Sequence, residues 1–212
     1  MFSINQITFS EPVDKDGVRC VEIFHNGEEF ILPTPKINLR TDIMERFPDE
    51  TFHSFDTQLS LTNRHTNKQI NDLYNFINFL ENKIIETAYE QRSKWFNKEV
   101  SLEELKDLFK PLIKESDMYG PTIFVKIPFK DKKWGFDLID DKQQKVDINN
   151  ESGSDVSVKD YIVRNAEVKC KLKLMIYIYQ DRLHSRFELN KCNIIYRPLP
   201  FQYDFSINSD SD

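Results

Sequence analysis

The chain has 212 residues, of which 39% are hydrophobic, 13% aromatic and 30% charged, and its formal net charge is −6 at pH 7. This composition predicts one substantial globular domain and excludes the disordered class. The five glycines argue against glycine-rich phosphate loops. The sequence shows neither a basic segment followed by an apolar run nor an 18-residue apolar stretch, so we expect an intracellular protein that is not secreted and has no membrane partner.

The cysteines indicate the cellular compartment, and the distribution of charge indicates where phosphates could bind. Cys20, Cys170 and Cys192 are widely separated and form no C-x-x-C pair, which predicts reduced core thiols in a reducing compartment. Between positions 163 and 197, eight Lys or Arg stand against three Asp or Glu, so this region carries +5 and the rest of the chain −11. An acidic body with one basic region still binds phosphates locally through counterion release.

The first sixty residues are predicted to be β structure. Alternating apolar residues indicate strands at positions 4–10, 18–24, 29–32 and 55–62. Asn26-Gly27 is a strong hairpin signal between two of them. Pro33 and Pro35 end the return strand because proline cannot donate to a ladder. Positions 40–52 are expected to form a loop.

From position 68 onward, the apolar residues are spaced as in a helix. Apolar residues recur at three- and four-residue spacing and predict a long amphipathic helix over 68–96. Trp95 and Phe96 close this helix, and we expect both side chains in the core. Ser101 and Glu104 form an S-x-x-E capping box that starts a second helix over 102–114. Pro111 bends or ends that helix.

Strand periodicity returns after position 120. Strands are expected at 123–127, 134–138, 168–179 and 187–196, with 142–148 as a candidate short strand and 180–185 as a turn. This order predicts an α+β fold, in which a helical insertion at 68–115 is inserted in or appended to an antiparallel β-barrel. We assign 1–198 to this single domain and 199–212 to a flexible acidic C-terminal tail.

The strand at 168–179 has two chemically opposite faces. Successive side chains of a strand point to opposite sides, so one face carries only apolar residues and cysteine. The other face is first basic and then aromatic, with Lys169, Lys171, Lys173, Met175, Tyr177 and Tyr179. Ammonium groups for phosphates beside rings for bases are the two components of single-strand binding. A plain solvent-exposed sheet face is the alternative.

Other residues share this basic and aromatic character. Phe124 and Lys126 alternate with apolar neighbours on a second strand, which predicts a second face of the same kind. The remaining candidates for a single-stranded DNA site lie at predicted turns or on the last strand: Lys132, Lys133, Trp134, Arg182 and Arg186.

Signatures of catalysis are missing from the sequence. It contains no Walker A, nucleophile-elbow, H-E-x-x-H or Cys/His zinc spacing. We therefore expect no catalytic residue, metal or cofactor, and we interpret the four histidines as surface residues. Asp137 and Asp140 belong to the densest carboxylate group, which a metal-dependent nuclease could use. A solvated hairpin end is the other interpretation.

Several segments together resemble a family of single-stranded DNA-binding proteins of nucleocytoplasmic large DNA viruses. The resemblance covers most of the chain and rests on these segments: 25–39 with its Asn26-Gly27 and Pro33-Thr34-Pro35, Trp95-Phe96, 111–114, 120–128, Val168-Lys169 and Arg186-Phe187-x-Leu189. It implies an OB-like β-barrel that coats single-stranded DNA without sequence preference during viral replication, recombination and repair.

The resemblance and the tail also suggest partners. We expect single-stranded DNA, viral replication proteins recruited through the acidic tail, and a homo-oligomer, located in a replication factory of the host cytoplasm or in the nucleus. Phe201, Tyr203 and Phe205 alternate, so this part of the tail could instead add a strand to a neighbouring subunit. The competing function is a viral structural or scaffolding protein whose aromatic face is a protein interface.

Overall fold

A computed structural model of the chain describes residues 6–15, 17–46, 53–96, 98–149, 157–180 and 182–198. The tail and its aromatic residues at 201–205 lie outside these ranges. The helices are η2 (Thr62–His65), α1 (Lys68–Glu90), α2 (Arg92–Trp95), α3 (Leu102–Leu108) and η3 (Val158–Asp160). The strands up to the helices are β1 (Ile7–Phe9), β2 (Val13–Lys15), β3 (Val18–Val21), β4 (Ile23–His25), β5 (Glu28–Glu29), β6 (Ile31–Pro33), β7 (Ile37–Leu39), β8 (Met44–Arg46) and β9 (Ser54–Ser60). The later strands are β10 (Ile113–Lys114), β11 (Thr122–Ile127), β12 (Phe129–Lys130), β13 (Lys133–Trp134), β14 (Asp137–Ile139), β15 (Lys145–Val146), β16 (Glu167–Tyr179) and β17 (Arg182–Tyr196).

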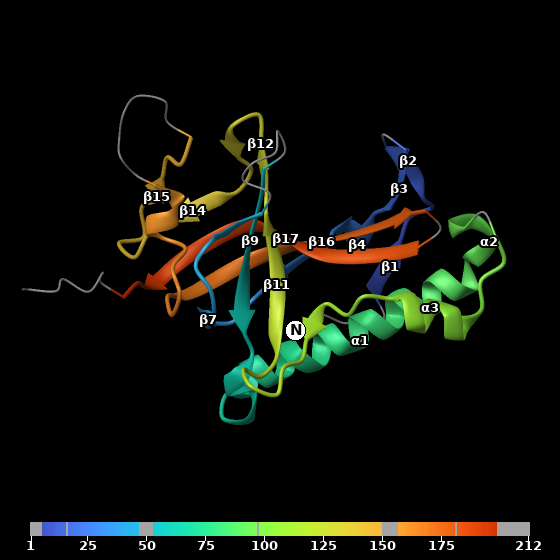
Figure 1. Cartoon of the computed structure of the whole chain (residues 1–212), viewed down its shortest axis with the longest axis horizontal. Helices are drawn as coiled ribbons and strands as arrows, with labels where there is room; N and C mark the ends of the chain where they lie inside the picture. Colours follow the sequence, from blue (N-terminus) through green and yellow to red (C-terminus); the bar gives the residue numbers. More distant parts are fainter. Residues whose placement is uncertain are drawn as a thin grey trace, which may run out of the picture.

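Five strands close into a barrel. β7 pairs with β9 and β9 with β11, both antiparallel; β11 pairs in parallel with β17; β17 pairs with β16 and β16 with β7, again antiparallel. Counted along the chain, these are barrel strands one to five, and they close in the order 1-2-3-5-4. This is the arrangement of an OB-like barrel, so the expected α+β fold with an OB-like barrel and helices is confirmed (Figure 1).

The long hairpin of β16 and β17 gives the barrel its shape. All six residues of the predicted apolar face of β16 are buried: Val168, Cys170, Leu172, Leu174, Ile176 and Ile178. The register between the two strands shifts after Lys171, and such a bulge bends and twists a strand. The Sγ atoms of Cys170 and Cys192 lie 4.0 Å apart inside the barrel, and the three cysteines are free thiols.

Helices η2, α1, α2 and α3 lie between the second and third barrel strands, and α1 runs along one side of the barrel (Figure 1). Asn67 caps α1 by accepting hydrogen bonds from the backbone N–H groups of Gln69 and Ile70. The predicted apolar stripe of α1 is buried, and so are Trp95 and Phe96, as expected. The Ser101 hydroxyl caps α3 through the N–H of Glu104, whose carboxylate pairs with Lys98 at 2.9 Å.

Four local predictions were wrong. The helix expected over 68–96 is interrupted at Gln91, which separates α1 from α2. The second helix ends at Leu108 instead of continuing to 114, because Pro111 disfavours helical geometry at the residue before it and has no N–H. Positions 40–52 are not all loop, since Met44–Arg46 forms the short strand β8 beside β9. The turn predicted at 180–185 is shorter, because β17 already begins at Arg182.

The smaller hairpins sit at the rim of the barrel. β12 pairs with β13, and β14 pairs with both β15 and β17; Figure 1 shows β12 on the side away from α1. The candidate strand at 142–148 is present as the two residues of β15. Within the described part of the chain, none of the helices combines the length and apolarity needed to span a bilayer.

Candidate nucleic-acid interface

The outer face of the barrel collects polar and aromatic side chains from four adjacent strands. Directly paired residues of neighbouring strands point to the same face of a sheet. On this face Phe124 of β11 stands beside Gln58 of β9, and Met175 of β16 beside Arg186 of β17. The register therefore brings the two faces predicted from separate strands, around Phe124 and around Tyr177, onto one surface.

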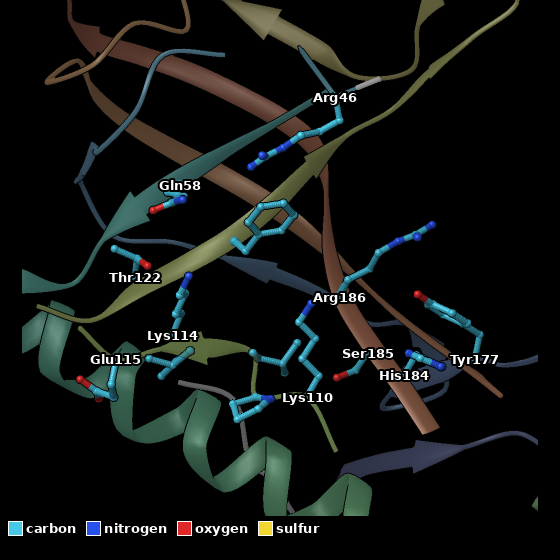
Figure 2. Close-up of a pocket in the computed structure, with 14 residues that line it drawn as sticks. Arg46, Gln58, Lys110, Lys114, Glu115, Thr122, Tyr177, His184, Ser185 and Arg186 are labelled. Carbon is cyan, nitrogen blue, oxygen red and sulfur yellow. The ribbon is translucent and has the colours of Figure 1, made fainter. Parts of the chain in front are cut away.

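A groove of about 580 Å³ lies along this surface. Its floor is the sheet, with Arg46, Gln58, Phe124, Tyr177, His184 and Arg186. Its opposite side is the segment 110–115, called here the wall segment, which follows α3 and contains β10. Figure 2 shows Lys110 and Lys114 on the wall segment, with Arg46 and Arg186 across the groove from them.

Exposed ring surface is present in the groove. The rings of Tyr177 and His184 are stacked, with centroids 5.0 Å apart and an interplanar angle of 9°. The guanidinium carbon of Arg186 lies 5.2 Å from the centre of the Tyr177 ring. Phe124 is 41% exposed although it is a large apolar residue. Exposed rings beside cations are the surfaces on which unpaired bases stack.

Two arginines of the groove are held in place by carboxylates. Arg46 donates to both carboxylate oxygens of the buried Asp56, at 2.8 and 3.3 Å. Arg186 donates from Nε and Nη2 to one oxygen of Glu188, at 3.1 and 2.7 Å. Such charge-assisted, forked hydrogen bonds fix the guanidinium plane. The carboxylates therefore hold both arginines in defined orientations at the groove.

Two titratable groups of the grooves have lowered pKa values, mainly through burial and partly through nearby cations. Burial lowers the pKa of His184, and the nearby charges of Arg182 and Lys110 lower it further. Burial also lowers the pKa of Lys126, with a smaller contribution from Arg186 and an opposing one from Glu188. Each of these groups thus lies near at least one cation, whose charge an anionic ligand would offset.

A second groove of about 630 Å³ lies further along the same face. Lys126, Lys130 and Lys132 line it together with Glu188 and His53. Lys126 pairs in register with Glu188, two residues beyond Arg186 on β17. The two grooves are therefore consecutive, and cations follow the surface from Lys110 to Lys132.

The predicted site residues fall into two groups. Phe124, Lys126, Tyr177 and Arg186 come together at the grooves, and Lys132 lines the second groove. Lys173 lies on the same face opposite Glu188 and pairs with Glu29 at 2.5 Å. Tyr179, 48% exposed, and Arg182 face each other at the end of the hairpin.

Lys173, Tyr179 and Arg182 do not line either groove, and neither do the other four predicted residues. Lys169 and Lys171 are exposed on the part of β16 beyond the bulge. Lys133 is exposed on the β12–β13 hairpin. Trp134 packs into an aromatic cluster, with its ring centre 4.8 Å from Phe55 and 4.7 Å from Phe129.

Several residues of the groove were not predicted from the sequence. The sequence pattern predicts a loop at Arg46 and a helix at Lys110 and Lys114, whereas the structure has Arg46 in β8 and Lys114 in β10. His184 was placed in a turn, although it alternates with Arg186 and Glu188 on the outer face of β17. Extending the period-two pattern of the last strand back to Arg182 would have identified His184.

The carboxylates considered for a metal have other partners. Asp137 pairs with Lys145 at 2.7 Å, which lowers the pKa of its carboxyl. Asp140 accepts hydrogen bonds from the backbone N–H groups of Lys142 and Gln144 and so holds a turn. Across the described residues, no three His, Cys, Asp or Glu side chains are grouped closely enough to hold a metal ion.

Comparison with known proteins identifies the class of fold. No family model and no curated protein matches the sequence. Among solved structures, the chain is similar to gp2.5, a single-stranded DNA-binding protein encoded by bacteriophage T7, with 12% identity over 86% of this chain and 99% of that chain and a TM-score of 0.52. It is also similar to the single-stranded DNA-binding protein from bacteriophage Enc34 in complex with single-stranded DNA, with 12% identity over 90% and 97% of the two chains and a TM-score of 0.51. The chain thus has an OB-like fold that phage single-stranded DNA-binding proteins share.

Proposed function

We propose that this protein binds single-stranded DNA without sequence specificity and acts in viral DNA replication, recombination or repair. The observation that carries the proposal is the position of the groove on the barrel. OB folds bind oligonucleotides on the face of strands two and three, between the loop joining strands one and two and the loop joining strands four and five. Here Gln58 and Phe124 belong to strands two and three, Arg46 to the first loop region, and Tyr177 and His184 flank the second.

The chemistry of the groove fits such a ligand. Bases released from pairing stack on Phe124 and on the Tyr177–His184 pair, and phosphates are contacted by the surrounding Lys and Arg side chains. Stacking tolerates any base because every base has a π face, which accounts for binding without sequence preference. The proposed role is binding alone and requires no catalytic group.

The biological setting is a further part of the proposal. The segmental resemblance supports a protein of nucleocytoplasmic large DNA viruses, which would act in a viral factory of the host cytoplasm or in the nucleus. In the same proposal, the acidic tail at 199–212 recruits replication proteins, and the protein forms homo-oligomers. The similarity to phage single-stranded DNA-binding proteins supports the DNA-binding part of this setting.

A scaffolding role is the second candidate function. The exposed ring of Phe124 suits a contact with another protein as well as it suits a stacked base. Binding of a labelled oligonucleotide to the Phe124→Ala variant distinguishes the two functions. Phe79 of α1, 46% exposed, provides the matched control variant Phe79→Ala. The DNA-binding proposal expects Phe124→Ala to cost about 1–3 kcal/mol of affinity and Phe79→Ala to cost little. Unchanged affinity in Phe124→Ala, together with altered self-association, would favour scaffolding.

A further inference from the structure

One side chain of α1 attaches the wall segment to this helix. A carboxylate oxygen of Glu81, in the middle of α1, accepts hydrogen bonds from the backbone N–H groups of both Leu112 and Ile113. Leu112 and Ile113 are themselves buried, and Ile113 pairs with Ile123 of β11. Glu81 therefore links α1 to the middle of the segment that faces the sheet across the groove.

A second attachment lies at the end of the wall segment. Glu115 accepts a hydrogen bond from the hydroxyl of Tyr74 at 2.8 Å and pairs with Arg64 at 3.3 Å. Arg64 in turn lies over the Tyr74 ring, 4.2 Å from its centre. These contacts come from α1 and from η2, so the two helices hold the wall segment at two successive points.

The lysines of the wall segment flank the Glu81 attachment. Lys110 precedes Leu112 by two residues, and Lys114 follows Ile113 directly. Both line the groove opposite Arg46 and Arg186 (Figure 2). The position of these two ammonium groups, and the width of the groove, therefore depend on where Glu81 holds the backbone.

Holding a loop with the carboxylate of Glu81 requires that a charged group be partly desolvated. This cost argues that the attachment has a specific function. Burial raises the pKa of its carboxyl, and the two backbone hydrogen bonds oppose that rise. A half-buried carboxylate that satisfies two backbone donors is strongly directional. A simple surface turn needs no such group.

On the basis of the proposed function, we infer that Glu81 is a positioning residue that sets the second wall of the DNA groove. It contacts no DNA. It holds Lys110 and Lys114 at the distance at which a single strand fits between them and the sheet, while a duplex, whose bases face inward, does not. Through Glu81, α1 thereby determines the preference for single-stranded over double-stranded DNA.

The test compares Glu81→Ala, the conservative Glu81→Gln, and the control Glu86→Ala at an exposed position of the same helix. Affinities for a single-stranded and a duplex oligonucleotide of equal length are measured, together with amide hydrogen exchange at Leu112 and Ile113. We expect Glu81→Ala to accelerate exchange at both amides and to lower single-strand affinity about tenfold while duplex affinity stays the same. Glu81→Gln, which keeps an acceptor oxygen, should lie between wild type and Glu81→Ala, and Glu86→Ala should behave as wild type.

A double-mutant cycle with Lys110→Ala separates positioning from a general loss of stability. If Glu81 positions Lys110, Lys110→Ala weakens binding in the wild type and has little further effect in the Glu81→Ala background. Additive effects, or an unchanged ratio of single-strand to duplex affinity in Glu81→Ala, would overturn the inference while the proposed function stands. A wild-type protein that binds no single-stranded DNA would overturn the proposed function and this inference with it.

Discussion

The ring of Tyr177 lies parallel to the ring of His184 at 5.0 Å, across directly paired positions of β16 and β17. The pair joins two strands into one flat surface at the end of the groove. Arg186 borders the same surface from the next outward position of β17. One stacked pair therefore combines ring area, a titratable imidazole and a neighbouring cation at the place where we expect a base to bind.

Side chains of β16 point alternately outward and into the barrel, so substitutions at adjacent residues should have different effects. Tyr177→Ala and Tyr179→Ala should each cost about 1–3 kcal/mol of single-strand affinity if a base stacks on the ring, with little loss of folding stability. Ile176→Ala and Ile178→Ala should cost about 2–5 kcal/mol of folding stability, because both isoleucines are buried in the barrel. Melting temperature and oligonucleotide affinity of all four variants check this. If the tyrosine variants unfold and the isoleucine variants lose only DNA binding, the binding face is misassigned.

The lysines should control the salt dependence of binding. Replacing Lys110 and Lys114 together by Gln should lower affinity for all sequences alike and reduce the slope of log K against log salt by about 0.7 for each lost phosphate contact. The triple change of Lys169, Lys171 and Lys173 to Ala tests the basic row of β16 in the same way. Lys106→Gln, on the exposed face of α3, is the matched control. A slope unchanged in the first variant would show that the wall segment touches no phosphate.

The titration of His184 predicts a pH dependence. Burial, followed by Arg182 and Lys110, holds its pKa below the ordinary value of 6.5, so the imidazole is neutral in the free protein at pH 7. A bound phosphate favours the protonated form, so DNA binding should take up a proton and affinity should rise as the pH is lowered from neutral. Affinity measured from pH 5 to 8 checks this, and His184→Gln should flatten the profile. A wild-type profile as flat as that of His184→Gln would contradict the assignment.

The lowered pKa of His184 has an effect of opposite sign on folding stability. Because the folded-state pKa of His184 is lowered relative to the unfolded chain, its contribution to stability is present above about pH 6.5 and is lost as pH falls toward the folded-state value. The free protein should therefore become less stable in the pH range where DNA binding becomes tighter. Thermal unfolding with and without an oligonucleotide distinguishes the two effects.

Trp134 should matter for stability more than for binding. Its ring packs against Phe55, Phe129 and Phe136, so Trp134→Ala should cost up to about 3–5 kcal/mol of folding stability. Affinity for single-stranded DNA should change little under conditions where the variant is folded. Denaturant unfolding and oligonucleotide titration of the same preparation check both expectations. A large loss of affinity in a stable variant would place Trp134 in the interface.

The fold was predictable because its main signals are local. The period-two pattern of β16 and the three- and four-residue spacing of α1 each follow from one segment, and both expectations hold in the structure. Closure of the barrel was not predictable in the same way. It depends on the parallel pairing of β11 with β17, between residues about sixty positions apart, such as Val125 and Phe187. No local pattern specifies that register.

The site was predictable only in part for the same reason. Phe124 and Tyr177 could be selected because each alternates with buried neighbours on its own strand. Arg46 and Lys110 could not, because Arg46 ends the short strand β8 and Lys110 lies in a connection, and the position of each is set by distant partners, Asp56 for Arg46 and the Glu81-bound backbone for the wall segment. A sequence shows which residues are basic, but the opposite sides of a groove come from separate parts of the chain.

The most direct test of the account is a fluorescence anisotropy titration with labelled single-stranded DNA, the corresponding duplex and the equivalent RNA, at a low and a high salt concentration. The account predicts that single-stranded DNA binds more tightly than duplex, with slight sequence preference and weaker binding at high salt. Duplex binding as tight as single-strand binding, or no binding of the single strand at low salt, would contradict it.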